Sequence, residues 1–186
     1  MDIHDIIRTR RSVRQFTSRP IQREEIERLL EAAIQAPNHR MTQPWRFYVL
    51  GPEARRAFGA VLGRRKAKKV EDPVAAQAVI DKVSNTNAAL PALIAVTTTL
   101  ADDPELREED YAATMMGVQN LLLTASALGL ATHIKSGAVM ADPGARAAIG
   151  VPEGERIVAL VEVGEPDESP APKARRTVAE VTRWLP

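Results

Sequence analysis

The sequence predicts one layered helix–sheet domain of the α/β or α+β class, and three observations lead to this prediction. The chain has 186 residues, a length that fits one domain with a sizeable core. Hydrophobic residues make up 45% of it and charged residues 26%, which is ordinary for a globular protein. Helical and strand patterns are interspersed without repeats or low-complexity tracts, so helices are expected to pack on a sheet.

Two amphipathic helices are expected near the N-terminus. Isoleucines at positions 3, 6 and 7 have helical spacing, which predicts a short helix that Asp2 caps and that ends near Thr9. An apolar stripe and three early glutamates predict a second helix over about 22–35. Ala36-Pro37-Asn38 ends this helix, because the residue before a proline disfavours helical backbone.

A strand and a third helix are expected next. The segment 46–50 reads Arg-Phe-Tyr-Val-Leu, and its aromatic and β-branched residues predict a strand. A helical pattern follows over about 52–66. The segment 64–87 is rich in charge, and we expect it to be a mobile helical excursion that could serve as a lid.

The C-terminal half continues this alternation. The apolar run 92–97 predicts a buried strand, and the acidic segment 101–109 is expected to be a connection. A helix over 110–128 is apolar on most sides, so it should lie at the centre or in a subunit interface, and Gly129 ends it. The remaining expected elements are a strand over 131–135, a short helix over 142–149, a strand over 156–163 and an extended C-terminal arm over 164–186 with a final helical turn near 178–181.

Charge and composition narrow the function classes. The net charge is only +1, which argues against a dedicated nucleic-acid binder. The chain has no cysteine, which excludes disulfides, thiolate metal sites and a cysteine nucleophile. The N-terminus lacks the pattern of a secretory signal, and the most apolar stretch contains Gln119 and Asn120. We therefore expect a cytoplasmic protein without a membrane span.

Motifs of several enzyme classes are also missing. The chain contains no P-loop, no G-x-G-x-x-G fingerprint and no G-x-S-x-G elbow. Its three histidines do not have the spacing of a metal site. A protein without evident side-chain machinery can leave the chemistry to a cofactor.

The basic cluster Arg10-Arg11-Ser12-Val13-Arg14 is the first candidate site. Planar guanidinium donors and a hydroxyl just after a helix suit a phosphate or the edge of a flavin. By charge alone, the favoured interpretation is that the cluster complements the helix dipole at the C-terminal end of the first helix. A third interpretation is a weak nucleic-acid contact, which the balanced total charge disfavours. It would be made by Arg8, Arg10, Arg11 and Arg14.

Three further segments could carry function. The loop 36–47 joins a helix to a strand and is rich in hydrogen-bond donors, although it could be an ordinary connection whose Trp45 packs in the core. Ile134-Lys135-Ser136-Gly137 stands at the end of a strand, where ligands often bind and where plain turns also occur. Pro172-Lys173-Ala174-Arg175-Arg176 is a basic patch in the tail, typical of a solvated surface.

Taken in order, these four segments resemble the flavin-dependent nitroreductase family, and most of all its compact bacterial members. The matching pieces are R-R-S-x-R, then A-P-N-H-x-x-x-Q-P-W-x-F, then K-S-G and finally P-K-A-R, over about residues 10–176. The resemblance implies an α+β fold: a three-layer α-β-α sandwich with a mostly antiparallel sheet, in an intertwined homodimer. It also implies two FMN molecules at the subunit interface, each contacted by both chains.

The resemblance also implies an activity. NAD(P)H would give hydride to flavin N5, and a nitroaromatic, a quinone or a similar electron-poor acceptor would then take it in a ping-pong cycle. The family includes other flavin chemistry as well, such as dehalogenation and flavin modification. A flavin-storing or anion-sensing dimer without catalysis is the remaining alternative. No protein group is expected to be catalytic, because the flavin carries the reaction.

The family's cofactor contacts can be carried over onto matching positions. Contacts to the FMN phosphate, ribityl chain or pyrimidine edge are implied for Arg10, Arg11, Ser12 and Arg14. A loop that plausibly comes from the partner chain would reach the flavin through Asn38, His39 and Gln43. The ring or phosphate would be lined by Ile134, Lys135, Ser136 and Gly137, and the phosphate grip completed by Lys173 and Arg175. Many members have serine in place of Asn38 and asparagine in place of Met41, and Asn85 is a further candidate for the pyrimidine edge.

Overall fold

The structure is a computed structural model that describes residues 2–186. Its first half contains α1 (Ile3–Thr9), α2 (Arg23–Ala33), β1 (Trp45–Val49), α3 (Pro52–Ala67) and α4 (Pro73–Ala88). Its second half contains β2 (Ala92–Thr99), α5 (Pro104–Ala127), β3 (Ala131–Lys135), the 3₁₀ helix η1 (Ala138–Ala141), α6 (Pro143–Ile149), β4 (Glu155–Gly164) and α7 (Val178–Val181).

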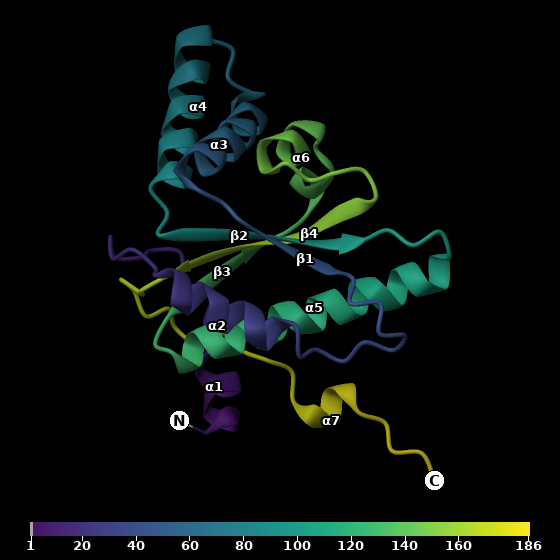
Figure 1. Ribbon diagram of the computed structural model, residues 1–186. Coiled ribbons are helices and arrows are strands. Elements are labelled where there is room, and N and C mark those ends of the chain that lie inside the picture. Colours follow the sequence, from purple (N-terminus) through teal and green to yellow (C-terminus); the bar gives the residue numbers. More distant parts are fainter. Residues whose placement is uncertain (1) are drawn as a thin grey trace.

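Four strands form one sheet in the order β1-β2-β4-β3, and all neighbouring pairs are antiparallel. Helices α2 and α5 cover one face of this sheet, while α3, α4 and α6 lie on the other side (Figure 1). The expected three-layer α-β-α sandwich is therefore confirmed.

Strand β2 explains why the run 92–97 is almost entirely apolar. Ile94 and Val96 belong to the core cluster under α2 and α5, whereas Leu93 and Ala95 belong to the cluster under α3 and α6. Successive side chains of a strand point to opposite faces, and here both faces are covered.

Helix α5 begins six residues earlier than the sequence pattern predicted, so the expected acidic connection 101–109 is mostly helix. Asp103 is the N-cap, and its carboxylate accepts a 2.9 Å hydrogen bond from the Glu105 backbone N–H. Pro104 occupies the first helical position, where its missing N–H costs nothing. Acidic residues interact favourably with the positive end of the helix dipole. Here they mark the start of a helix, whereas the sequence pattern predicted that they belong to a loop.

The charged segment 64–87 is mostly helical, as expected. It contains the end of α3 and nearly all of α4, and these two helices pack against each other as a tight hairpin. A Cβ at Gly59 would lie 2.8 Å from Asn87 Cβ, and one at Gly63 would lie 2.7 Å from the Ile80 Cα. The two helices can approach this closely because glycine has no side chain. The expected mobility of this hairpin stays a prediction.

The N-terminal segment runs between β3 and the residues that follow β4. The Val13 backbone N–H donates to Thr132 on β3 at 3.0 Å, and Thr17 N–H donates to Glu165 at 3.0 Å. Phe16 stacks over Gly164, where an added Cβ would lie 2.6 Å from the Phe16 Cγ. These contacts attach the basic cluster to the edge of the sheet.

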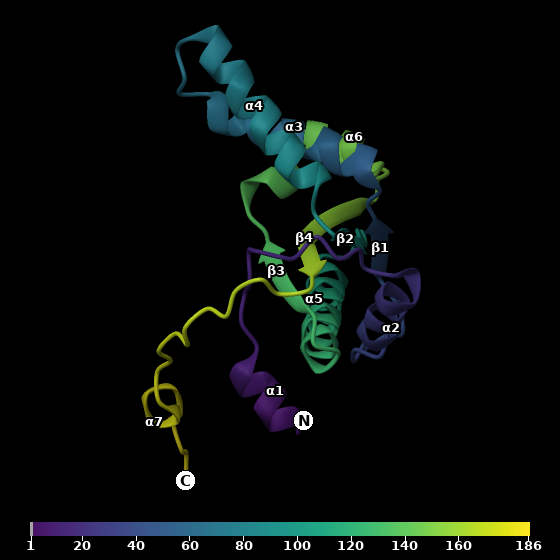
Figure 2. The same cartoon turned by 90° about the vertical axis from the view of Figure 1, so that its left-hand side faces the viewer.

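Beyond Glu168 the chain is extended and exposed, and α7 stands away from the layers (Figure 2). Its apolar side chains Val178, Val181, Trp184 and Leu185 are exposed, Trp184 to 90%. No helix among residues 2–186 is both long and apolar enough to cross a membrane. The cytoplasmic location expected from the sequence stays a prediction.

Candidate functional site

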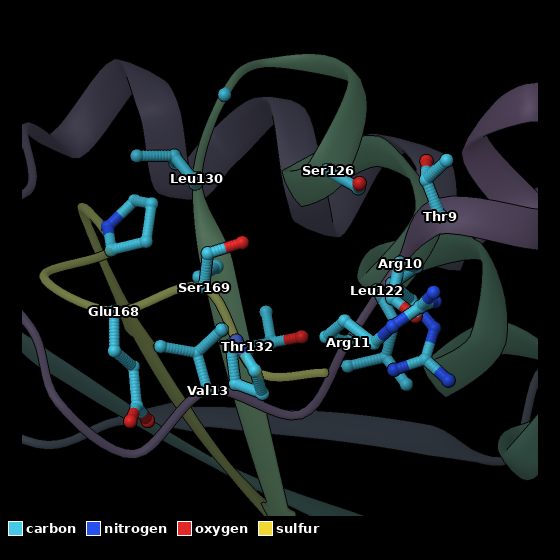
Figure 3. A pocket seen from close by; sticks show the side chains of 14 residues that line it. Thr9, Arg10, Arg11, Val13, Leu122, Ser126, Leu130, Thr132, Glu168 and Ser169 are labelled. Atoms are coloured by element: carbon cyan, nitrogen blue, oxygen red, sulfur yellow. Dashed lines mark hydrogen bonds between the residues drawn. The ribbon is translucent and has the colours of Figure 1, made fainter. Parts of the chain in front are cut away.

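The end of α1 and the C-terminal arm enclose a cavity of about 890 Å³, which we call the arginine cavity. Five of the predicted site residues line it, namely Arg10, Arg11, Ser12, Lys173 and Arg175. A smaller pocket of about 220 Å³ shares Arg10 and Arg11 with it. Figure 3 shows these two side chains together on one side of the smaller pocket, with Glu168 on the opposite side.

The local backbone explains how the cluster presents its side chains. Arg10 leaves the helix as its C-cap, with its N–H still bonded to Ile6. Ser12 then pairs with Thr132 in a parallel bridge beside β3. Val13 is buried while its neighbour Ser12 is exposed, because successive residues of extended chain face opposite ways.

The arginine cavity carries uncompensated positive charge. Partial burial, and then the charges of Arg175 and Arg11, lower the pKa of Arg10. Within residues 2–186, none of the four cations Arg10, Arg11, Lys173 and Arg175 forms an ion pair. These cations repel one another around the cavity, and a bound anion would relieve that repulsion. The cavity is therefore suited to binding an anion.

Arg14 does not line this cavity. Its Nε donates a 3.3 Å hydrogen bond to His133 Nε2 on β3, and its backbone N–H donates to Glu168 Oε1 at 2.7 Å. The other ring nitrogen of His133 lies 2.9 Å from Glu162 Oε2, and Lys135 pairs with the second oxygen of Glu162. The predicted residues Arg14 and Lys135 therefore belong to a separate, internally paired cluster.

Glu162 is 4% exposed although it is charged. Burial by itself would raise the pKa of Glu162, but the hydrogen bond from His133 and the charge of Lys135 together lower it below its usual value. The carboxylate is thus kept ionised by its neighbours.

The loop before β1 holds the predicted residues Asn38, His39 and Gln43. Asn38 Oδ1 accepts a 2.6 Å hydrogen bond from the Gln43 N–H, which closes the loop on itself. Met41 and Gln43 have φ angles of 52° and 46°, in the left-handed region that non-glycine residues seldom adopt. Such strain persists only where neighbours hold it, and it is common at functional sites.

Helix α5 supports this loop. Thr42 donates to Asp110 Oδ1 at 2.5 Å, and His39 Nδ1 lies 2.9 Å from Glu109 Oε1. A hollow of about 410 Å³ lies between the loop and α5, lined by Asn38, His39 and Met116 among others. Its lining shares no residue with that of the arginine cavity, so one chain holds the two sets of predicted residues in separate places.

The remaining predicted residues lie at the end of β3 and on α4. Ile134 packs against the core under α2 and α5, while Ser136 and Gly137 follow the strand and are exposed. Gly137 has a φ of 100°, a conformation that favours glycine. Asn85 accepts a hydrogen bond from Arg56 in the α3–α4 hairpin, which lies on the far side of the sheet from α1 (Figure 1).

Sequence reasoning missed the acidic residues that organise these places: Glu162, His133's partner, and Asp110, Thr42's partner. Glu162 is a carboxylate inside an otherwise apolar segment, which is the signal that could have found it. Asp110 ends an acidic run, so the sequence around it gives no such signal. In the part of the chain that the structure describes, no group of three acidic, histidine or cysteine side chains could hold a metal ion.

The known family whose sequence pattern matches is the Nitroreductase family, over residues 7–165. The chain belongs to the nitroreductase family. A relative is the protein of Bacillus subtilis named "Putative NAD(P)H nitroreductase YfhC". It is 33% identical over 183 residues, which cover 96% of this chain and 91% of that protein.

Solved structures agree with this membership in the nitroreductase family. The crystal structure of a nitroreductase-like family protein from Bacillus cereus has a TM-score of 0.86 and 31% identity, covering 100% of this chain and 96% of that one. A Desulfovibrio desulfuricans structure, described as a "putative nitroreductase in complex with FMN", has a TM-score of 0.75 and 24% identity. It covers 100% of this chain and 98% of that one, and this likeness shows the shared fold.

Proposed function

We propose that the protein is an FMN-dependent oxidoreductase, with NAD(P)H as reductant and a nitroaromatic, a quinone or a similar electron-poor compound as acceptor. The observation that carries the proposal is the arginine cavity, where four cations from opposite ends of the chain meet, none of them in an ion pair within the described part of the chain. Membership in the nitroreductase family supports it, as does the FMN bound by the Desulfovibrio relative.

The donor set of the arginine cavity fits the phosphate of FMN. A phosphate monoester carries a charge near −2 at neutral pH and accepts several hydrogen bonds. The guanidinium groups of Arg10, Arg11 and Arg175, the ammonium of Lys173 and the hydroxyl of Ser12 would supply them. When bound, the flavin supplies the redox chemistry by taking hydride from the nicotinamide and passing it to the acceptor.

The protein's own part is to bind and orient. The cations fix the phosphate end, and the exposed turn Ser136-Gly137 offers backbone N–H groups beside the end of β3. The strained loop with Asn38, His39 and Gln43 supplies a second set of polar groups. Rigid placement of this kind is what a protein contributes to a reaction that the cofactor performs.

We also propose a homodimer in which the loop of one chain faces the arginine cavity of the other. The support is that one chain keeps these two sets of groups in separate places. The exposed apolar side chains on α7 and at the C-terminus also need a covering surface. Sedimentation should give twice the 20.3 kDa of the chain, and a stable flavin-loaded monomer would contradict this assembly.

A colour and reduction test decides the function. The purified protein should be yellow, or become so with added FMN, and its flavin absorbance should bleach under anaerobic NADPH or NADH. Adding a nitroaromatic or quinone should restore the colour without oxygen. A colourless protein that does not bind FMN would refute the proposal. A reduced flavin that no acceptor reoxidises would refute the choice of acceptors.

A further inference from the structure

Glu162 is a buried charged residue in the apolar part of β4. Its neighbours along β4 are Val161 and Val163, which belong to the core under α2 and α5. Its own side chain points to the opposite face, as the alternation of a strand requires. A carboxylate in such a place is costly unless ionic partners compensate it, so its partners indicate its role.

The partners of Glu162 both come from β3. His133 lies directly opposite Glu162 in the strand register, and Lys135 is two residues further along, on the same face. His133 Nδ1 lies 2.9 Å from one carboxylate oxygen, and Lys135 Nζ bonds the other. Both oxygens are used, and the side chain of Glu162 is enclosed while that of Lys135 is 31% exposed.

His133 extends the cluster to the N-terminal segment. Arg14 can only donate, so His133 Nε2 must accept its hydrogen bond. Glu162 can only accept, so His133 Nδ1 must carry the proton. These two partners assign a neutral imidazole with the hydrogen on Nδ1. His133 thereby links Arg14 to Glu162 through two consecutive hydrogen bonds.

The cluster differs in kind from the arginine cavity. Among residues 2–186 the cations of that cavity have no acidic partner, whereas Lys135 is paired with Glu162 and Arg14 is bonded to His133. Of the buried pair, Lys135 is the member that reaches the surface, next to the exposed turn Ser136-Gly137. Glu162 therefore neutralises part of the positive charge at the end of β3, and it fixes the position of the Lys135 ammonium group there.

We propose that Glu162 is a positioning residue for the cofactor: it holds Lys135 directly and Arg14 through His133, and it limits the positive charge that Lys135 presents to the flavin. The inference rests on the proposed function, since it assigns a role toward bound FMN. Reduced flavin gains negative charge, so a cation at the ring favours the reduced form. A lysine balanced by a carboxylate favours it less.

The test compares affinities for oxidised and reduced FMN in a double-mutant cycle. Glu162→Gln keeps the shape of the side chain and removes its charge. We expect it to raise the affinity ratio, reduced over oxidised, roughly tenfold, the effect of one unit charge about 10 Å away at a dielectric constant of about 20. In the Lys135→Met background only the direct field of the carboxylate is lost and no lysine is released, so the same change should have a clearly smaller effect. An equal effect in both backgrounds, or none in either, would overturn the proposal.

Glu27→Gln is the matched control, because it removes one carboxylate from the exposed Arg23–Glu27 pair on α2 and should not alter the ratio. A second measurement needs neither variants nor FMN. Nitrogen-15 spectra of histidine in the wild-type chain should show His133 protonated on Nδ1, and an Nε2–H tautomer would overturn the proposal. Failure of the wild type to bind FMN at all would instead refute the proposed function.

Discussion

The hydroxyl of Thr42 donates a 2.5 Å hydrogen bond to Oδ1 of Asp110, which joins the loop before β1 to the buried side of α5. Asp110 is only 2% exposed, so this bond is one of the few ways in which its carboxylate can be compensated. The bond also holds Thr42 between Met41 and Gln43, the two residues with positive φ. One hydrogen bond thus compensates the buried carboxylate of Asp110 and also holds the strained backbone around Thr42 in place.

Replacing Thr42 by valine should destabilise the protein by about 1–3 kcal/mol, because it leaves a buried acceptor without its donor. Urea denaturation gives the free energy of unfolding that tests this value. Thr86→Val is the matched control, since the Thr86 hydroxyl only donates to a backbone oxygen on the exposed side of α4. Equal losses in both variants would mean that Asp110 does not depend on Thr42.

Replacing Arg10 by alanine should weaken FMN binding by about 1.5–3 kcal/mol, through the loss of charge-assisted hydrogen bonds. Fluorescence titration of the apoprotein measures the dissociation constant. The wild-type affinity should also fall as salt rises, because cations grip the ligand. Arg23→Ala, in the exposed pair on α2, should change nothing. An unchanged affinity in Arg10→Ala would remove Arg10 from the phosphate site.

Replacing Gly164 by alanine should cost about 1–3 kcal/mol of stability, because the new Cβ would lie 2.8 Å from the Phe16 Cβ. Either β4 or the segment that carries Phe16 would then have to shift. Thermal or urea unfolding measures the loss. Gly51→Ala should cost less, since a Cβ there has no atom within 4 Å. In a Phe16→Ala background the penalty of Gly164→Ala should shrink, and an undiminished penalty would assign it to another contact.

The acid limb of the stability curve should depend on Glu162. Its folded-state pKa is lowered, so its contribution is complete above the unfolded value of about 4.3 and is lost as the pH falls through the lower folded value. Glu162→Gln should therefore cost about 1.5–3 kcal/mol at pH 7. The difference from wild type should narrow below about pH 4. A difference that is constant between pH 7 and pH 3 would contradict this linkage.

Sequence patterns predicted the fold, whereas only the structure shows which of the predicted site residues lie together. Periodicity places α2 and β2 because their signals lie within a few residues of one another. The start of α5 was missed because Asp103 and Pro104 can begin a helix or belong to a loop, and only the packing of the helix decides. The basic cluster Arg10–Arg14 was found as one unit because it is contiguous.

The structure divides that cluster, which local sequence could not reveal. Arg10 faces a cavity that the C-terminal arm completes, while Arg14 turns to His133 and to Glu168, 154 residues away. Lys135 was predicted to line the flavin ring or its phosphate, and its ionic partner Glu162 is 27 residues further along the chain. Which charges are free and which are paired is decided by strand register, and that is a property of the assembled sheet.

The interleaving of the two ends of the chain has a consequence for synthesis. Residues 13–17 bond to Thr132, Glu165 and Asp167, so their places do not exist until almost the whole polypeptide has left the ribosome. The first segment made is then among the last to dock, and the basic cluster stays solvated meanwhile. Contacts of such sequence separation slow folding, because a long loop must close first. A truncated product that ends before β4 would lack Glu165, Asp167 and the strand with which β3 pairs, and so most of what holds its N-terminal segment.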